Sequence, residues 1–106
     1  MTLRGILDIN PLLAERTRLA ILSALVAEGG PLDFNSLMER LKLTRGNLSV
    51  HAMKLEGAGL VSIEKKFRGK IPLTLYRSTD KGRDELVAFL EKMKSLLGAA
   101  LAGDVE

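Results

Sequence analysis

The sequence of 106 residues predicts a mainly α-helical domain with one small β-hairpin. Three observations support this fold class. Apolar residues recur at helical spacing in three stretches, within residues 10–28, 35–59 and 79–101. Over residues 60–78 the apolar period changes to two, as in β-strands. The length, with a hydrophobic fraction of 46%, suits one compact core, so we expect a single domain over residues 1–106.

The first helix is predicted over residues 10–28. Asn10 followed by Pro11 is typical of a helix start, because asparagine caps free N–H groups and proline suits the first helical position. Gly29-Gly30-Pro31 ends this helix. Residues 1–9 are apolar and predict either an additional helical turn or an arm. Residues 32–34 are long enough only for the edge of a sheet.

Two short helices follow within residues 35–59. Asn35 is the predicted cap of the first, and Thr44 is the predicted cap of the second, which Gly57-Ala58-Gly59 ends. Lys42-Leu43 leaves room for only a tight connection between them. Two short helices joined by a tight turn predict a helix-turn-helix.

The hairpin is predicted over residues 60–78 and the last helix over residues 79–101. Alternating apolar residues predict one strand after Leu60 and a second strand up to Ser78. The segment 65–72 between them is basic and contains a glycine and a proline, so we expect a turn or loop there. Thr79 is the predicted cap of the last helix.

The charge distribution favours a polyanionic partner. The net charge is only +3, with a pI of about 9.5. Residues 40–77, however, carry nine basic and two acidic side chains, a net charge of +7, and the rest of the chain carries −4. A basic centre of this kind is typical of nucleic-acid-binding domains.

Several function classes are disfavoured by what the sequence lacks. Without cysteine there is no disulfide, thiol nucleophile or zinc–thiolate site, and His51 alone cannot form a transition-metal site, so we expect it to be structural. No apolar run is long enough to span a bilayer, and no signal peptide is evident, so we expect a cytoplasmic protein. Paired carboxylates, a nucleophile–base pair and a phosphate-binding loop are also missing, so we expect neither an enzyme nor a cofactor.

The stretch LKLTRGNLSVHAMKLEGAGLV, from Leu41 to Val61, resembles the recognition helix and first wing strand of ArsR-like and MarR-like regulators of bacteria and archaea. RTRLAILSAL, residues 16–25, resembles the first domain helix of these families, and YRSTDKGR, residues 76–83, resembles the end of their wing. The resemblance covers nearly the whole chain. It implies a winged helix-turn-helix with a long C-terminal dimerisation helix. The chain departs from the pattern at Lys42, where these families often have glycine, and a left-handed lysine costs about 1 kcal/mol.

The resemblance implies that residues 44–58 form a recognition helix for the DNA major groove and that residues 65–72 form a basic wing on the backbone or minor groove. Arginine can bind guanine and asparagine can bind adenine through paired hydrogen bonds. The candidate DNA-binding residues are Thr44, Arg45, Gly46, Asn47, Ser49, Val50, Lys54, Lys65, Lys66, Arg68 and Lys70. The alternatives are a solvated polar helix surface and a hairpin whose lysines only protect its edges. We expect Phe67 to be a packing residue.

The last helix carries apolar residues at seven-residue spacing, which is typical of helix–helix contacts. We expect it to pack against a second copy of the chain, together with the N-terminal segment; the alternative is that it packs only on its own domain. The candidate dimer residues are Leu3, Ile6, Leu86, Phe89, Leu90, Met93, Leu96, Leu97 and Ala100.

The function that these patterns favour is sequence-specific binding of double-stranded DNA by a homodimeric transcription regulator. The alternative is a winged-helix protein-interaction module that does not bind DNA. A small-molecule effector is compatible with these patterns, but no residue indicates one.

Overall fold

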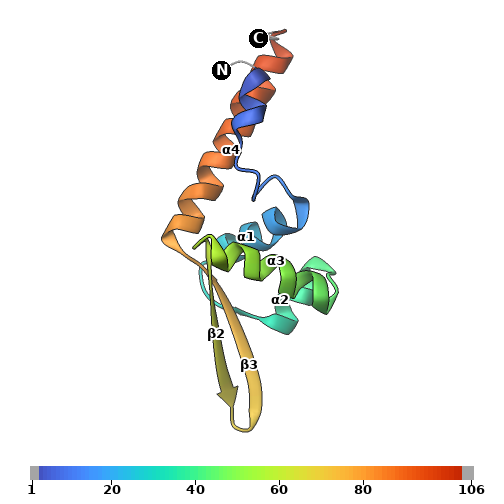
Figure 1. The fold of residues 1–106 in the computed structure, drawn as a ribbon, viewed down its shortest axis with the longest axis vertical. Coiled ribbons are helices and arrows are strands. Elements are labelled where there is room, and N and C mark those ends of the chain that lie inside the picture. The colour runs from blue at the N-terminus through green and yellow to red at the C-terminus, as the bar shows by residue number, and fades with distance from the viewer. Residues whose placement is uncertain (1–2, 104–106) are drawn as a thin grey trace.

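The computed structural model describes residues 3–103. Its elements are η1 (Leu3–Asp8), α1 (Arg16–Glu28), β1 (Leu32–Asp33), α2 (Phe34–Leu41), α3 (Arg45–Gly57), β2 (Val61–Arg68), β3 (Ile71–Ser78) and α4 (Asp80–Leu101). The predicted fold class and element order are confirmed. The molecule measures 59 × 25 × 21 Å, because α4 and the β2–β3 hairpin leave the helical centre in opposite directions (Figure 1). No helix within residues 3–103 is long and apolar enough to cross a membrane.

The first helix begins at Arg16, so the predicted start at Asn10 is wrong. The side chain of Asn10 accepts a hydrogen bond from the N–H of Leu12 at 2.9 Å and closes a turn. The dipeptide Asn-Pro is as typical of turns as of helix starts. The cap is Glu15, whose carboxylate accepts the N–H groups of Thr17 at 3.0 Å and Arg18 at 2.9 Å. The ambiguous N-terminal segment contains the short 3-10 helix η1.

The helix-turn-helix consists of α2 and α3. The cap of α2 is Asp33 rather than the predicted Asn35. The predicted cap of α3 is confirmed, because the hydroxyl of Thr44 accepts the N–H of Asn47 at 3.2 Å. Lys42 ends α2 in the left-handed conformation, with a φ of 54°. The connection therefore keeps the backbone shape that glycine would favour, at the energetic cost expected for a lysine.

The hairpin strands are longer than predicted. β2 continues to Arg68 and β3 begins at Ile71, so most of the expected loop 65–72 is paired strand. Only Gly69 and Lys70 form the turn, and the positive φ of Gly69, 64°, is what a two-residue turn of type II′ requires at its first position. The sheet order is β1-β3-β2, and both pairings are antiparallel.

The core lies where α1, α2, α3 and the base of the hairpin meet. Its fully buried side chains are Leu13, Ile21, Leu22, Leu25, Leu37, Leu48, Leu55 and Leu60. The start of α4 is attached to the end of α3 by two side-chain hydrogen bonds: the hydroxyl of Thr79 donates to the carbonyl of Gly59 at 2.6 Å, and Lys81 Nζ donates to that of Ala58 at 3.0 Å. α3 and α4 therefore hold each other in position.

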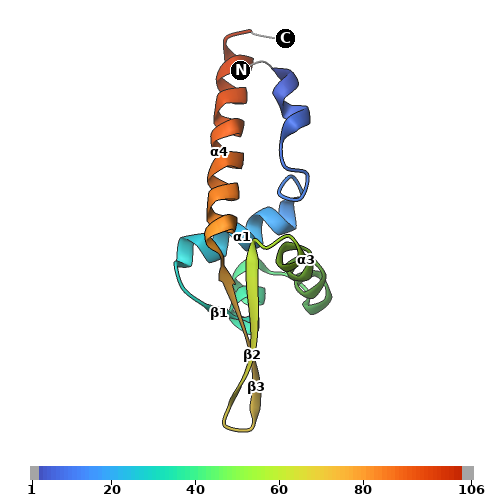
Figure 2. The ribbon, with the colours of Figure 1, turned by 60° about the vertical axis from the view of Figure 1, so that its left-hand side comes forward.

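The apolar residues of α4 divide between two faces. Leu86, Phe89 and Leu96, three of the predicted dimer residues, are only 4–6% exposed. Leu86 and Phe89 belong to the domain core, and η1 contacts α4, beside which it runs in Figure 2. As residues of an open dimer surface, these three were predicted wrongly. The large apolar side chains that stay exposed on α4 are Val87, Leu90, Met93, Leu97 and Leu101. Of the other predicted residues, Ile6 and Ala100 are exposed and Leu3 is half-buried.

Candidate nucleic-acid interface

The α3 helix presents most of the predicted DNA-binding residues to solvent. Its buried side consists of Leu48, Ala52 and Leu55. The other side is open, and Ser49 is the only predicted residue of α3 that is half-buried. The exposed ones are Thr44, Arg45, Gly46, Asn47, Val50 and Lys54. Met53, which was not among the predicted site residues, is 65% exposed on the same helix.

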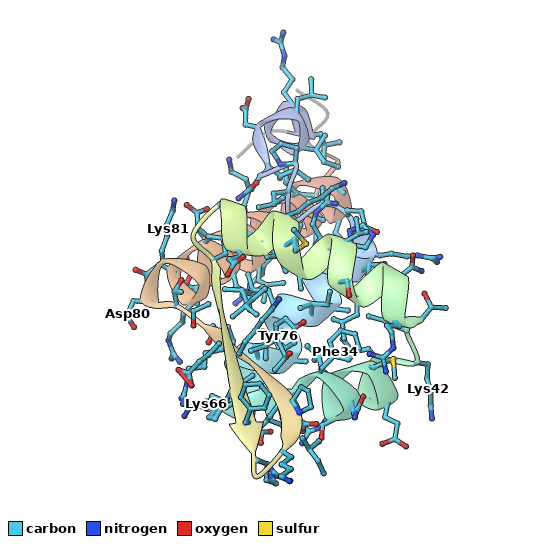
Figure 3. The ribbon with its side chains drawn as sticks, turned by 60° about the horizontal axis from the view of Figure 1, so that its bottom comes forward. Phe34, Lys42, Lys66, Tyr76, Asp80 and Lys81 are labelled. Atoms are coloured by element: carbon cyan, nitrogen blue, oxygen red, sulfur yellow. The ribbon has the colours of Figure 1, made fainter. Side chains whose placement is uncertain are left out.

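The guanidinium of Arg45 lies 4.9 Å from the ring centre of Phe34, the first residue of α2. Phe34 in turn contacts Tyr76 of β3, with 6.1 Å between ring centres and a tilt of 43° between the rings (Figure 3). A cation over an aromatic face is attracted to it, so Phe34 restricts where the Arg45 side chain can point. Sequence reasoning missed Phe34, whose only signal was an apolar residue directly before the predicted second helix.

An open groove of about 890 Å³ separates α3 from the hairpin. Arg45, Ser49 and Met53 line its helix side, and Lys65 and Thr74 line its hairpin side. Phe34 and Tyr76 also border it, as Figure 3 shows in the view from below. Burial, followed by the nearby carboxylate of Glu56, raises the pKa of Tyr76, so its phenol stays neutral. The groove thus joins the exposed side of α3 to the basic hairpin.

The hairpin places its four predicted cations on strand and turn positions rather than on a loop. Lys65 faces the groove, whereas Lys66 forms an ion pair with Glu64 at 2.9 Å. Arg68 ends β2 directly before the turn, Lys70 lies within the turn, and both are exposed. The expected packing role of Phe67 is wrong, because its side chain is 72% exposed.

His51 lies on the side of α3 that faces α1. Its Nδ1 is 3.1 Å from Nη1 of Arg18 and 3.5 Å from Oε2 of Glu15. Arg18 also donates from Nε to the carbonyl of Leu12 at 2.7 Å. These contacts attach α3 to the start of α1, and holding two helices together in this way is the structural role expected for the lone histidine.

The carboxylate of Glu15 has an unusually low pKa. Partial removal of water raises this pKa, but the N–H groups of Thr17 and Arg18 and the nearby His51 outweigh that effect and hold it at about 2. The ordinary value for a glutamate is 4.5. The ionised form is therefore favoured in the folded state.

Replacing Glu15 with glutamine is expected to lower the free energy of unfolding at neutral pH by about 1 kcal/mol, the usual contribution of an N-cap. A depressed pKa contributes stability that is fully present above about pH 4.5 and is lost as the pH falls through about 2. The difference in the free energy of unfolding between Glu15→Gln and the wild type should therefore shrink as the pH falls across that range. Urea unfolding at several pH values and one protein concentration measures it, and a gap that stays constant with pH would contradict the assignment.

Comparison with known proteins agrees with this geometry. Residues 17–97 match the model of a family described as the winged helix DNA-binding domain. An uncharacterised protein from Methanocaldococcus jannaschii is 41% identical over 66 residues, which are 61% of this chain and 67% of that protein.

Two solved structures are similar in fold and sequence. A transcriptional regulator homologue from Pyrococcus horikoshii OT3 superposes with a TM-score of 0.78 and 31% identity, over 84% of this chain and 87% of that one. The PcaV transcriptional regulator from Streptomyces coelicolor, solved with its natural ligand, gives a TM-score of 0.65 and 28% identity over 84% of this chain and 62% of its own. These relatives confirm the resemblance to winged-helix regulators, and the chain belongs to the winged helix DNA-binding domain family.

Proposed function

We propose that this chain is a homodimeric transcription regulator that binds a specific sequence in double-stranded DNA and has no catalytic role. In this proposal, residues 44–58 enter the major groove and the hairpin contacts the adjacent backbone or minor groove. The observation that carries the proposal is the exposed side of α3, where Arg45 and Asn47 stand in the first turn beside a groove that leads to the basic hairpin. First-turn residues of a recognition helix are the ones that reach base edges.

The charges around this surface support a phosphate-rich partner. Between Val61 and Ser78 the only acidic side chain is Glu64, and it is paired with Lys66. Lys65, Arg68 and Lys70 remain available to phosphates. A wing that contacts the backbone in this way fixes the orientation of the protein on DNA, while the bases are distinguished by α3.

The exposed apolar stripe of α4 supports the homodimer. Leu90, Met93, Leu97 and Leu101 follow one another at spacings of three and four residues, so they lie on one side of the helix, and each is at least 37% exposed. A two-fold interface would bring the same stripe from two copies together. It would also place two recognition helices on two half-sites of one DNA duplex.

The test is selection of bound sequences from random duplex DNA by the purified protein. We expect an enriched site with two inverted half-sites, because a two-fold protein reads a pseudo-palindrome. Enrichment of no sequence, together with no binding of any duplex at low salt, would instead favour the protein-interaction module.

Arg45→Ala and Asn47→Ala are each expected to weaken binding to the selected site by about 1–3 kcal/mol and to relax the preference at one base pair of each half-site. Binding to random DNA should change much less. The charge-matched control for Arg45→Ala is Arg4→Ala, which removes one positive charge from η1, at the opposite end of the molecule from the hairpin (Figure 1). Fluorescence anisotropy with the selected duplex and with its single-base variants measures both effects. Equal losses on selected and random DNA would mean that the two residues contact only phosphates.

A further inference from the structure

The end of the β2–β3 hairpin exposes two large apolar side chains. Phe67 is 72% exposed and Ile71 is 68% exposed. The hairpin projects away from every helix, so no other described element covers its end (Figures 1 and 2). Nearer the base of the same strands, Val61 and Tyr76 are buried in the domain core. The apolar tip thus contributes nothing to the core.

The strand register places these two side chains on opposite faces of the hairpin. Phe67 is paired with Pro72, and Arg68 is paired with Ile71. Paired residues share a face, and successive residues along a strand alternate between faces. One face of the tip therefore carries Phe67 and Pro72, and the other carries Ile71 and the stem of Arg68. The turn at Gly69 and Lys70 stands at the end between the two faces.

The charges around the tip identify the kind of surface it fits. Lys65, Arg68 and Lys70 surround the apolar residues, which makes an uncharged protein surface a poor match. The minor groove of a DNA duplex offers two walls of deoxyribose with phosphates along their rims, and it is about 6 Å wide. Proteins that bind in this groove often insert apolar side chains among basic ones.

We propose that the hairpin tip is a two-sided apolar wedge for the minor groove, in which Phe67 packs against the sugars of one strand and Ile71 against the sugars of the other. The surrounding cations contact the phosphates at the rims. This inference rests on the proposed DNA-binding function and adds two specific residues to it. Apolar contacts of this kind release no counterions from DNA, so their contribution to affinity does not depend on the salt concentration.

The first test separates apolar from ionic contacts by their response to salt. Phe67→Ala is expected to lower affinity for the selected duplex about tenfold or more at every salt concentration, because burial of a phenylalanine is lost, and to leave the slope of log affinity against log salt unchanged. Lys65→Ala, the ionic comparison, should reduce that slope by about 0.9 for each phosphate contact removed, counted twice in a dimer. Phe67→Leu should recover most of the affinity. The melting temperature of the Phe67 variants should match that of the wild type, since the side chain is exposed.

The second test uses hydroxyl-radical footprinting, which reports the exposure of deoxyribose along the minor groove. The wild type should protect a short run of sugars on both strands where each wing lies. Phe67→Ala should lose protection mainly on one strand and Ile71→Ala mainly on the other. Identical footprints for the wild type and both variants, with equal affinities, would overturn the wedge while leaving the proposed function intact.

The third test asks whether the tip binds an anionic membrane instead of DNA, because such a membrane also accepts basic, apolar surfaces. Flotation with vesicles of anionic phospholipid should recover little wild-type protein. Vesicle binding that Phe67→Ala abolishes, without any change in DNA affinity, would overturn the inference. A wild type that binds no DNA would overturn the proposed function and the wedge together.

Discussion

Gly82→Ala is expected to lower the free energy of unfolding by about 3 kcal/mol, at the upper end of the usual cost of overpacking. Gly82 is buried in the first turn of α4, and a Cβ atom there would overlap with the carbonyl oxygen of Leu60. The same Cβ would lie 2.9 Å from the carbonyl carbon of Leu60 and 3.2 Å from Cδ1 of Leu22. The obstacle is backbone, so α4 itself must shift to make room.

Such a shift would break contacts that connect α4 to α3, the proposed recognition helix. The carbonyl of Leu60 accepts the N–H of Thr79 at 3.1 Å, and Thr79 and Lys81 bind the carbonyls at the end of α3. DNA affinity should therefore fall together with stability. Urea unfolding monitored by circular dichroism measures the first effect, and binding to the selected duplex measures the second.

The matched control is Gly98→Ala in the same helix. No atom of residues 3–103 lies within 4 Å of a Cβ at that position, so only the helix propensity changes. This variant should gain about 0.5–1 kcal/mol. If Gly82→Ala proved as stable as Gly98→Ala, the close approach of α4 to Leu60 would be wrong.

Leu97→Glu is expected to convert the proposed dimer into a monomer and to lower affinity for the complete site about a hundredfold or more, because the second half-site is no longer bound in the same event. Leu97 is 60% exposed in the centre of the α4 stripe, and a two-fold interface would bury two added carboxylates close together. Sedimentation equilibrium at micromolar concentration measures the oligomeric state.

The control for this prediction is Ser95→Glu. Ser95 is exposed two residues away on the same helix, so the added charge is the same but points away from the stripe. It should leave both the dimer and the affinity unchanged. A monomeric wild type, or a Leu97→Glu protein that remains dimeric, would show that the α4 stripe is not a dimer interface.

Local signals were sufficient for most of the fold. Thr44 and Thr79 were recognised as caps because a capping hydroxyl acts on N–H groups only a few residues away. The hairpin followed from a period of two and a glycine at its turn, and the basic centre followed from counting charges. The predicted α3 residues lie on one helix, so their common exposure depends mainly on helical spacing, which the sequence carries directly.

The errors lie where distant parts of the chain compete for the same residues. Asn10 carries a capping signal, yet α1 begins at Arg16 with Glu15 as its cap, because the chain before it turns so that the carbonyl of Leu12 meets Arg18. β2 extends past Lys65 because pairing with β3 satisfies the hydrogen-bonding groups of its backbone. The composition of the segment does not reveal this pairing.

The sequence by itself determined the element types, the helix-turn-helix and the basic surface, because these depend on neighbours within a turn or a strand. Only the tertiary structure decided which side of α4 is covered by η1, that Arg45 rests on Phe34, and that Phe67 stays exposed. Each of these depends on residues that the chain brings together from far apart. Contacts of this kind are set by how packed elements exclude water and one another, and no local pattern encodes that arrangement.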